Sequence, residues 1–156
     1  MKKSRDCNLQ STTGECLMGL FDHPQMNPEE LSPAVWAYIG DAIYELFVRC
    51  QLLANGPVKT RQLHQLATAK VRASFQAEMV HRMEPYLTEK EREIVKRGRN
   101  VKSGHVPASV DVVTYRYSTA FEALLGFLYL NQAHDRLQEI LEMTLRLSEE
   151  NFNAQS

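Results

Sequence analysis

The chain has 156 residues, of which 44% are hydrophobic and 24% charged, and its formal net charge at pH 7 is −1. This composition predicts one folded domain with its own core, and it excludes a protein that binds nucleic acid through bulk positive charge. Because the three cysteines are too few for a disulfide framework and there is no leader or membrane-length apolar run, we expect a cytoplasmic protein with no membrane contact.

Residues 1–28 are polar and aperiodic, apart from a short apolar run at 16–21. We expect a flexible N-terminal arm whose apolar run packs on the domain or on a partner chain. Zinc binding by Cys7, Cys16 and His23 is disfavoured, because paired ligand spacings such as Cys-x-x-Cys are absent.

The segment 32–54 predicts the helix around which the fold is organised. Ser32 is a suitable N-cap, Pro33 suits the first helical position, and Asn-Gly-Pro at 55–57 ends the helix. Apolar side chains surround the predicted axis, which is typical of a helix in a core.

This helix contains two acidic residues, Asp41 and Glu45. We expect Asp41 to point away from the main apolar stripe, into a second apolar face. An ionised carboxylate buried without a partner costs several kcal/mol. Asp41 must therefore be paired, neutral, at a crevice or bound to a cation.

The next segments predict one long helix at 60–83 and a short one that begins at a capping box, 88–91, and ends at Gly98. The long helix has one apolar and one basic face. The basic face is either a surface that follows phosphates or an ordinary solvated face.

Four basic residues and no acid occur between positions 96 and 102, a segment that we expect to be a mobile loop. Such a loop can follow a phosphate backbone, although it can also be an ordinary charged connection. Asp111 is either an N-cap or an additional acid. The candidate phosphate-binding residues are Lys96, Arg97, Arg99 and Lys102, with Arg116 further along the chain.

A second helix, predicted at 117–131, is apolar nearly all round and has Glu122 as its single charge. Gly40 and Gly126 lie inside the two apolar helices, where glycine costs about 1 kcal/mol relative to alanine and usually permits close backbone approach. We therefore expect the two helices to cross and to bring Asp41 and Glu122 together.

Two carboxylates held close together repel each other and raise the pKa of one of them unless a cation neutralises them. Oxygen ligands of this kind suit Mg²⁺ or Mn²⁺, and such an ion can activate water to attack a phosphodiester. An amphipathic helix at about 135–147 and a polar tail complete the chain.

Tyr-Ile-Gly-Asp-Ala-Ile at 38–43 resembles the signature helix of ribonuclease III, and Phe-Glu-Ala-Leu-Leu-Gly-Phe-Leu-Tyr-Leu at 121–130 resembles its second catalytic helix. The strings at 96–104 and 114–123 further resemble the small bacterial branch called Mini-ribonuclease III. The resemblance extends from about residue 32 to the last helix.

The resemblance implies an all-α fold, with a ribonuclease III-type helical endonuclease domain at 29–148, the arm at 1–28 and a disordered tail at 149–156. It implies no separate domain for binding double-stranded RNA. It also implies a homodimer that cuts both strands of duplex RNA with Mg²⁺, Mn²⁺ being able to substitute. The branch trims the precursor of the large-subunit (23S) ribosomal RNA.

Residue by residue, Asp41 and Glu122 match the family's catalytic and metal-binding acids. Glu45 is a candidate for supporting these two acids without binding the metal ion itself, and the five basic residues named above are candidates for RNA binding. Ala37 and Thr119 stand where larger family members have two further acids, which leaves the number of metal ions open.

Two alternatives compete with a nuclease. One is a relative that holds RNA or a ribosomal partner without cutting, and the other is a helical bundle whose acids pair with Arg49 or Arg116. We expect a dimer because Trp36, Tyr44 and Phe47 offer more apolar surface than one small core consumes.

Overall fold

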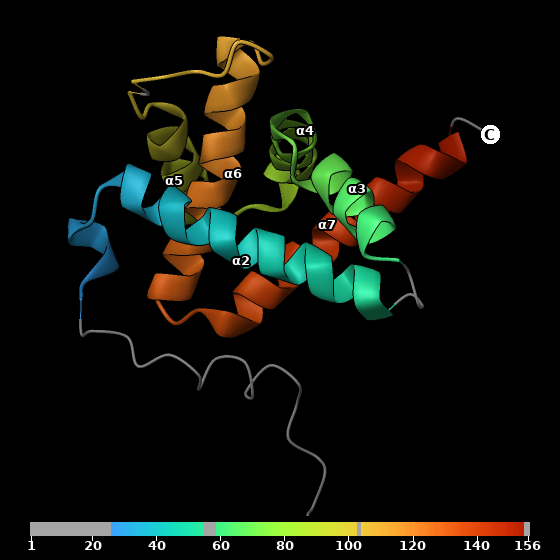
Figure 1. The fold of residues 1–156 in the computed structure, drawn as a ribbon. Coiled ribbons are helices and arrows are strands. Elements are labelled where there is room, and N and C mark those ends of the chain that lie inside the picture. The colour runs from blue at the N-terminus through green and yellow to red at the C-terminus, as the bar shows by residue number, and fades with distance from the viewer. Residues whose placement is uncertain (1–25, 55–58, 103, 155–156) are drawn as a thin grey trace, which may run out of the picture.

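The computed structural model describes residues 26–54, 59–102 and 104–154. These residues form helices and contain no strand, which confirms the predicted all-α class (Figure 1). In chain order the elements are η1 (Pro28–Glu30), α2 (Pro33–Ala54), α3 (Thr60–Val71), α4 (Ala73–Met83), η2 (Glu84–Tyr86), α5 (Glu89–Arg99), α6 (Val112–Leu130) and α7 (His134–Ala154).

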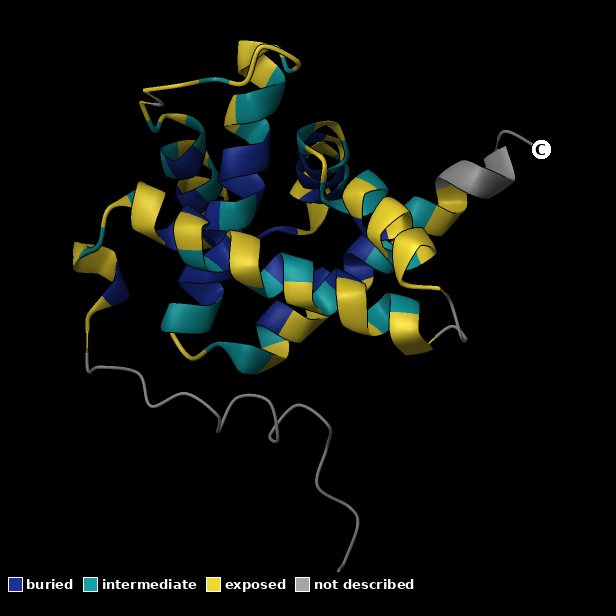
Figure 2. Ribbon diagram, in the orientation of Figure 1, coloured by how far each residue is buried: buried dark blue, intermediate teal, exposed yellow. Residues whose placement is uncertain are grey.

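Helix α6 lies at the centre of the fold. It begins at Asp111, whose carboxylate accepts a hydrogen bond from the Thr114 N–H at 2.9 Å, so the N-cap interpretation of Asp111 is confirmed. α6 packs against α2, α4, α5 and α7, and most of its length is buried (Figure 2). An apolar helix that is enclosed in this way organises the core around itself.

The crossing of α2 over α6 depends on two glycines, as the sequence predicts. A Cβ added to Gly40 would lie 2.6 Å from the Glu122 carbonyl carbon and 2.9 Å from the Gly126 nitrogen. A Cβ on Gly126 would lie 2.7 Å from the Trp36 carbonyl carbon. Because nothing larger than hydrogen fits at either position, the two backbones are in direct contact.

Gly40 also decides which face of α2 is buried. The buried side chains of α2 include Trp36, Tyr44 and Val48. The expected main stripe is largely exposed, since Ile39 and Ile43 are half-buried and its other members are exposed: Val35, Ala42, Leu46, Cys50 and Leu53. The prediction that α2 is enclosed on all sides is therefore wrong for this chain. Trp36 and Tyr44 are core residues and Phe47 is half-buried, so they are not surplus surface. The exposed apolar residues of α2 are instead Val35, Tyr38, Leu46 and Leu53.

Trp36 anchors α2 to the segment before it and to α5. Its indole N–H donates to the Pro28 carbonyl at 2.8 Å, and the Arg97 guanidinium lies 4.4 Å from the centre of its ring system. Pro28, the last residue of the expected flexible arm, is buried, so the folded part of the chain begins earlier. Residues 1–25 lie outside the described residues. They include the apolar run at 16–21 and the three residues considered for zinc, Cys7, Cys16 and His23.

Several helix boundaries differ from those that the sequence predicts. The second apolar helix, expected at 117–131, begins already at Val112, because Asp111 caps it there. The expected helix at 60–83 is two helices, because Arg72 has extended backbone angles of φ −63° and ψ 148°. α5 continues through Gly98 to Arg99, because Gly98 packs against Ala120 and Ala123 of α6 rather than ending the helix. α7 continues to Ala154, so the expected disordered tail is helical as far as that residue.

The N-terminus of α5 is held by an ion pair between buried Glu91 and half-buried Arg136. The predicted capping box is present, with Thr88 accepting from the Glu91 N–H at 3.2 Å and the Glu91 carboxylate accepting from the Thr88 N–H at 2.8 Å. Arg136 of α7 donates to both oxygens of Glu91 at 2.8 and 3.0 Å and to the Tyr86 carbonyl at 2.8 Å. This network joins α5 to α7.

No helix in the described part of the chain has the length and apolar character needed to cross a membrane.

Candidate active site

Asp41 follows Gly40 directly, so it lies at the edge of the contact between α2 and α6. Its side chain is exposed, which corrects the expectation that it points into a second apolar face. Partial burial and the negative charge of Glu45 one turn further along α2 raise the pKa of Asp41. Asp41 is therefore an accessible acid in a negative environment.

Glu122 is the other acid at this crossing, and it lies on α6 where the backbone meets Gly40. Its side chain is more buried than that of Asp41. Burial is the largest cause of its perturbation, and together with the negative charge of Asp41 it raises the pKa of Glu122 to about 8. The predicted approach of Asp41 and Glu122 is thus present in the structure.

Among the described residues, no ion pair neutralises either acid. Arg49 pairs with Glu45 at 2.7 Å instead, and both side chains are largely exposed. Arg116 is exposed and is not among the groups that perturb Glu122. The alternative in which Arg49 or Arg116 neutralises the acids therefore has no support in the described contacts.

Gln76 of α4 is a site residue that the sequence reasoning missed. It is 1% exposed, and its side-chain hydrogen bond to Glu122 lowers the pKa of that carboxyl and so opposes the effect of burial. The available signal was a glutamine within the apolar stripe of the predicted 60–83 helix, at a position where a side chain faces the core.

The donor set fits a divalent cation, with few protein ligands. In the described parts of the chain, no group of three or more His, Cys, Asp or Glu side chains is suited to hold a metal ion. Ala37 is buried in an apolar cluster, and the Thr119 hydroxyl donates to the Tyr115 carbonyl at 3.1 Å, so neither residue supplies a donor. Asp41 and Glu122 nevertheless offer carboxylate oxygens without a cationic partner, which is the donor chemistry that Mg²⁺ and Mn²⁺ prefer. The remaining ligand positions would fall to water or to a substrate.

The structure separates the basic residues that the sequence grouped into one loop. Lys96, Arg97 and Arg99 belong to the last turns of α5, and only Lys102 lies beyond the helix. Arg97 is half-buried over Trp36, on a different side of α5 from Lys96 and Arg99.

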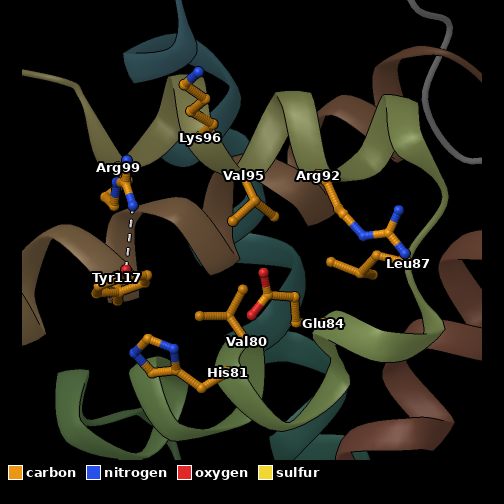
Figure 3. Close-up of a pocket in the computed structure, with 9 residues that line it drawn as sticks. All are labelled: Val80, His81, Glu84, Leu87, Arg92, Val95, Lys96, Arg99 and Tyr117. Carbon is orange, nitrogen blue, oxygen red and sulfur yellow. Dashed lines mark hydrogen bonds between the residues drawn. The ribbon is translucent and has the colours of Figure 1, made fainter.

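Lys96 and Arg99 line a cleft of about 260 Å³ between α4, α5 and α6 (Figure 3). Arg99 donates to the Tyr117 hydroxyl at 3.2 Å, and the His81 ring lies 4.0 Å from the Tyr117 ring. Lys96 extends away from Tyr117, and the Glu84 carboxylate lies in the same cleft (Figure 3). Arg99 is therefore fixed by its neighbours, whereas Lys96, Lys102 and Arg116 are exposed and unencumbered by any ion pair in the described contacts.

Comparison with known proteins places these observations in a family context. The model of the Ribonuclease III domain matches residues 34–133. The chain is 43% identical over 138 residues to Mini-ribonuclease 3 from Thermoanaerobacter sp., a match that covers 86% of this chain and 97% of the relative. It is 50% identical over 109 residues to Mini-ribonuclease 3 from Desulfitobacterium hafniense, covering 70% of this chain and 69% of that one.

A crystal structure of a protein from Fusobacterium nucleatum has a similar fold. The TM-score is 0.69 at 30% sequence identity, and the match covers 76% of this chain and 95% of that chain. The matched family region includes both acids at the crossing of α2 and α6.

Proposed function

Because the chain belongs to the ribonuclease III family and to its Mini-ribonuclease III branch, we propose that it is an endoribonuclease that cuts double-stranded RNA with Mg²⁺. The observation that carries this proposal is the pair Asp41 and Glu122. The two acids are coupled electrostatically at a backbone contact, and no cation of the described chain neutralises them.

Asp41 and Glu122 would hold the divalent cation. When bound, Mg²⁺ supplies positive charge to a phosphodiester and acidifies water, which is how metal-dependent hydrolases cut phosphate esters. The protein contributes the placement of its acids. The glycine contact fixes α2 against α6, so the backbone positions that carry the two acids are held at a set spacing.

Duplex RNA is recognised mainly through its phosphates and 2′-hydroxyls rather than through its bases. Lys96, Lys102 and Arg116 are exposed and suit contacts with phosphates, and Arg99 is held toward the cleft by Tyr117. Arg97 has a structural partner in Trp36, so we infer that it contributes least to RNA affinity.

We infer that the active form is a homodimer, because a duplex has two strands to cut and this chain supplies one pair of acids. The exposed apolar side chains of α2 support the same inference. Tyr38 is 78% exposed, and Leu46 and Leu53 are 47% and 63% exposed on the same helix. An apolar surface of this kind on a folded domain is typical of an interaction site.

Cleavage of a defined RNA duplex tests the proposal directly. With Mg²⁺ the wild-type protein should cut the duplex and spare the matching single strands, and EDTA should stop the reaction. Asp41→Asn and Glu122→Gln should each abolish cleavage but retain RNA binding, because each removes a charge at almost constant volume. Glu45→Gln should be milder, because Glu45 is already paired with Arg49.

The same assay tests the alternative of a relative that binds RNA or a ribosomal partner without cutting. Wild-type protein that binds the duplex but leaves it intact in Mg²⁺ and in Mn²⁺ would support that alternative. For the physiological substrate, we infer the precursor of the large-subunit ribosomal RNA in the cytoplasm, by relation to the Mini-ribonuclease III branch. Discrete cleavage of a 23S precursor transcript, absent with Glu122→Gln, is the expected result.

A further inference from the structure

The buried side chain of Gln76 has a role that its surroundings define. We propose that Gln76 is a positioning residue, whose amide holds the Glu122 carboxylate in the orientation needed to share a cation with Asp41. This inference rests on the proposed function, because it assigns Gln76 to the same site.

Burying the Gln76 amide among apolar side chains costs free energy, which indicates that the amide has a specific hydrogen-bond partner. It is 1% exposed and shares the buried face of α4 with Met79, Val80 and Met83. A buried amide without a hydrogen bond is destabilising, because it loses its bonds to water and gains none in return. Within the described residues, the only fully buried side-chain polar atom without a partner is Nδ1 of His134, so the Gln76 amide is not among the orphaned groups. Its identified partner is the Glu122 carboxylate.

The break between α3 and α4 at Arg72 allows α4 to bring Gln76 close to Glu122. The extended backbone at Arg72 ends α3 and gives α4 a direction of its own, and α4 then packs alongside α6 (Figure 1). Gln76 lies in the first turns of α4, facing α6.

A neutral amide suits this position better than a charged group. An arginine or lysine would neutralise Glu122 and compete with the cation, whereas an amide N–H orients a carboxylate oxygen and leaves the charge in place. Thr119 and Ala37 do not orient Glu122 in the described structure, because the Thr119 hydroxyl donates to the Tyr115 carbonyl and Ala37 has no polar group. This chain lacks the two further acids that larger family members have at the positions of Ala37 and Thr119 and that would help to orient Glu122. Gln76 thus orients Glu122 in their absence.

The test compares Gln76→Met with the wild-type protein. Methionine matches glutamine in length and volume but donates no hydrogen bond. We expect the affinity for Mn²⁺, measured by isothermal titration calorimetry, to fall by about 10-fold or more, as for other residues that orient metal ligands. On duplex RNA, kcat should fall by a similar factor while KM stays the same, because the RNA-binding residues are untouched.

Thr144→Val is the matched control. Thr144 is also a buried polar residue, 2% exposed, but its hydroxyl donates to the Leu141 carbonyl within α7 and hydrogen-bonds with the Tyr44 hydroxyl, with no contact to either acid in the described structure. Its loss should lower the urea midpoint of unfolding and leave Mn²⁺ affinity and kcat at the wild-type values.

The inference is overturned if Gln76→Met binds Mn²⁺ and turns over duplex RNA as the wild type does. It is also overturned if Thr144→Val loses as much Mn²⁺ affinity as Gln76→Met, since Gln76 would then act only through general stability. Wild-type protein that neither binds Mn²⁺ nor cuts duplex RNA would instead refute the proposed function, and the role of Gln76 with it.

Discussion

Replacing Gly40 with alanine tests whether the contact between α2 and α6 sets the geometry of the site. The added methyl would collide with the Glu122 carbonyl oxygen and lie 2.6 Å from its carbonyl carbon, whereas carbon atoms in contact prefer about 3.5–4.0 Å. The helices must therefore separate by at least about 1 Å. Because the obstacle is backbone, the cost falls at the upper end of the usual range for overpacking, about 3 kcal/mol. The better helix propensity of alanine offsets about 1 kcal/mol, so we expect a net destabilisation of about 2 kcal/mol.

Activity should suffer more than stability. A displacement of about 1 Å between catalytic groups can lower a rate by about 100-fold. The assays are urea unfolding and single-turnover cleavage of duplex RNA, at a temperature at which the variant is fully folded. Gly104→Ala is the control, because a Cβ at Gly104 meets nothing within 4 Å. A Gly40→Ala protein with wild-type stability and rate would refute the close contact and the spacing argument built on it.

Three further predictions concern other parts of the fold. Because the pKa of Glu122 is raised to about 8, the folded state holds a proton that the unfolded chain has already released, so metal-free stability should fall as pH rises from about 5 to about 8. Urea unfolding in EDTA should show this slope, and Glu122→Gln should remove it. Arg136→Ala should cost about 2–3 kcal/mol by leaving the buried Glu91 without its partner, whereas loss of the exposed partner Glu139 should cost less than about 0.5 kcal/mol in the same unfolding assay. If the protein is the proposed homodimer, Tyr38→Glu should convert it to a monomer in sedimentation experiments, and a wild-type protein that is already monomeric at micromolar concentration would contradict this proposal.

The sequence predicted the features that depend on local signals. The capping box at Thr88 and the close approach of Gly40 to Gly126 follow from residue types at fixed spacings. For Asp111 the sequence left an N-cap and an additional acid open, and the structure shows the N-cap. The break at Arg72 could not be predicted, because no glycine or proline marks it and its extended backbone follows from the packing of α4 on α6.

The periodicity of apolar residues also could not predict which face of α2 is buried. When apolar residues occur all round a helix, hydrophobicity alone does not select a face, and here the selection is made by the contact at Gly40. Asp41 is consequently exposed rather than buried. The pairing of Asp41 with Glu122 was still predictable, because both acids adjoin the two glycines, whereas Gln76 was missed because glutamine usually faces solvent.

The central position of α6 has a consequence for how the site responds to heat. Hydrogen exchange occurs most slowly in the elements whose opening requires global unfolding. α6 is enclosed by α2, α4, α5 and α7, so its amides around Glu122 should exchange only through complete unfolding of the domain. Glu122 should then stay in place on heating until the whole domain unfolds. On heating, catalytic activity and helical circular dichroism should disappear in one transition, with no inactive folded state in between.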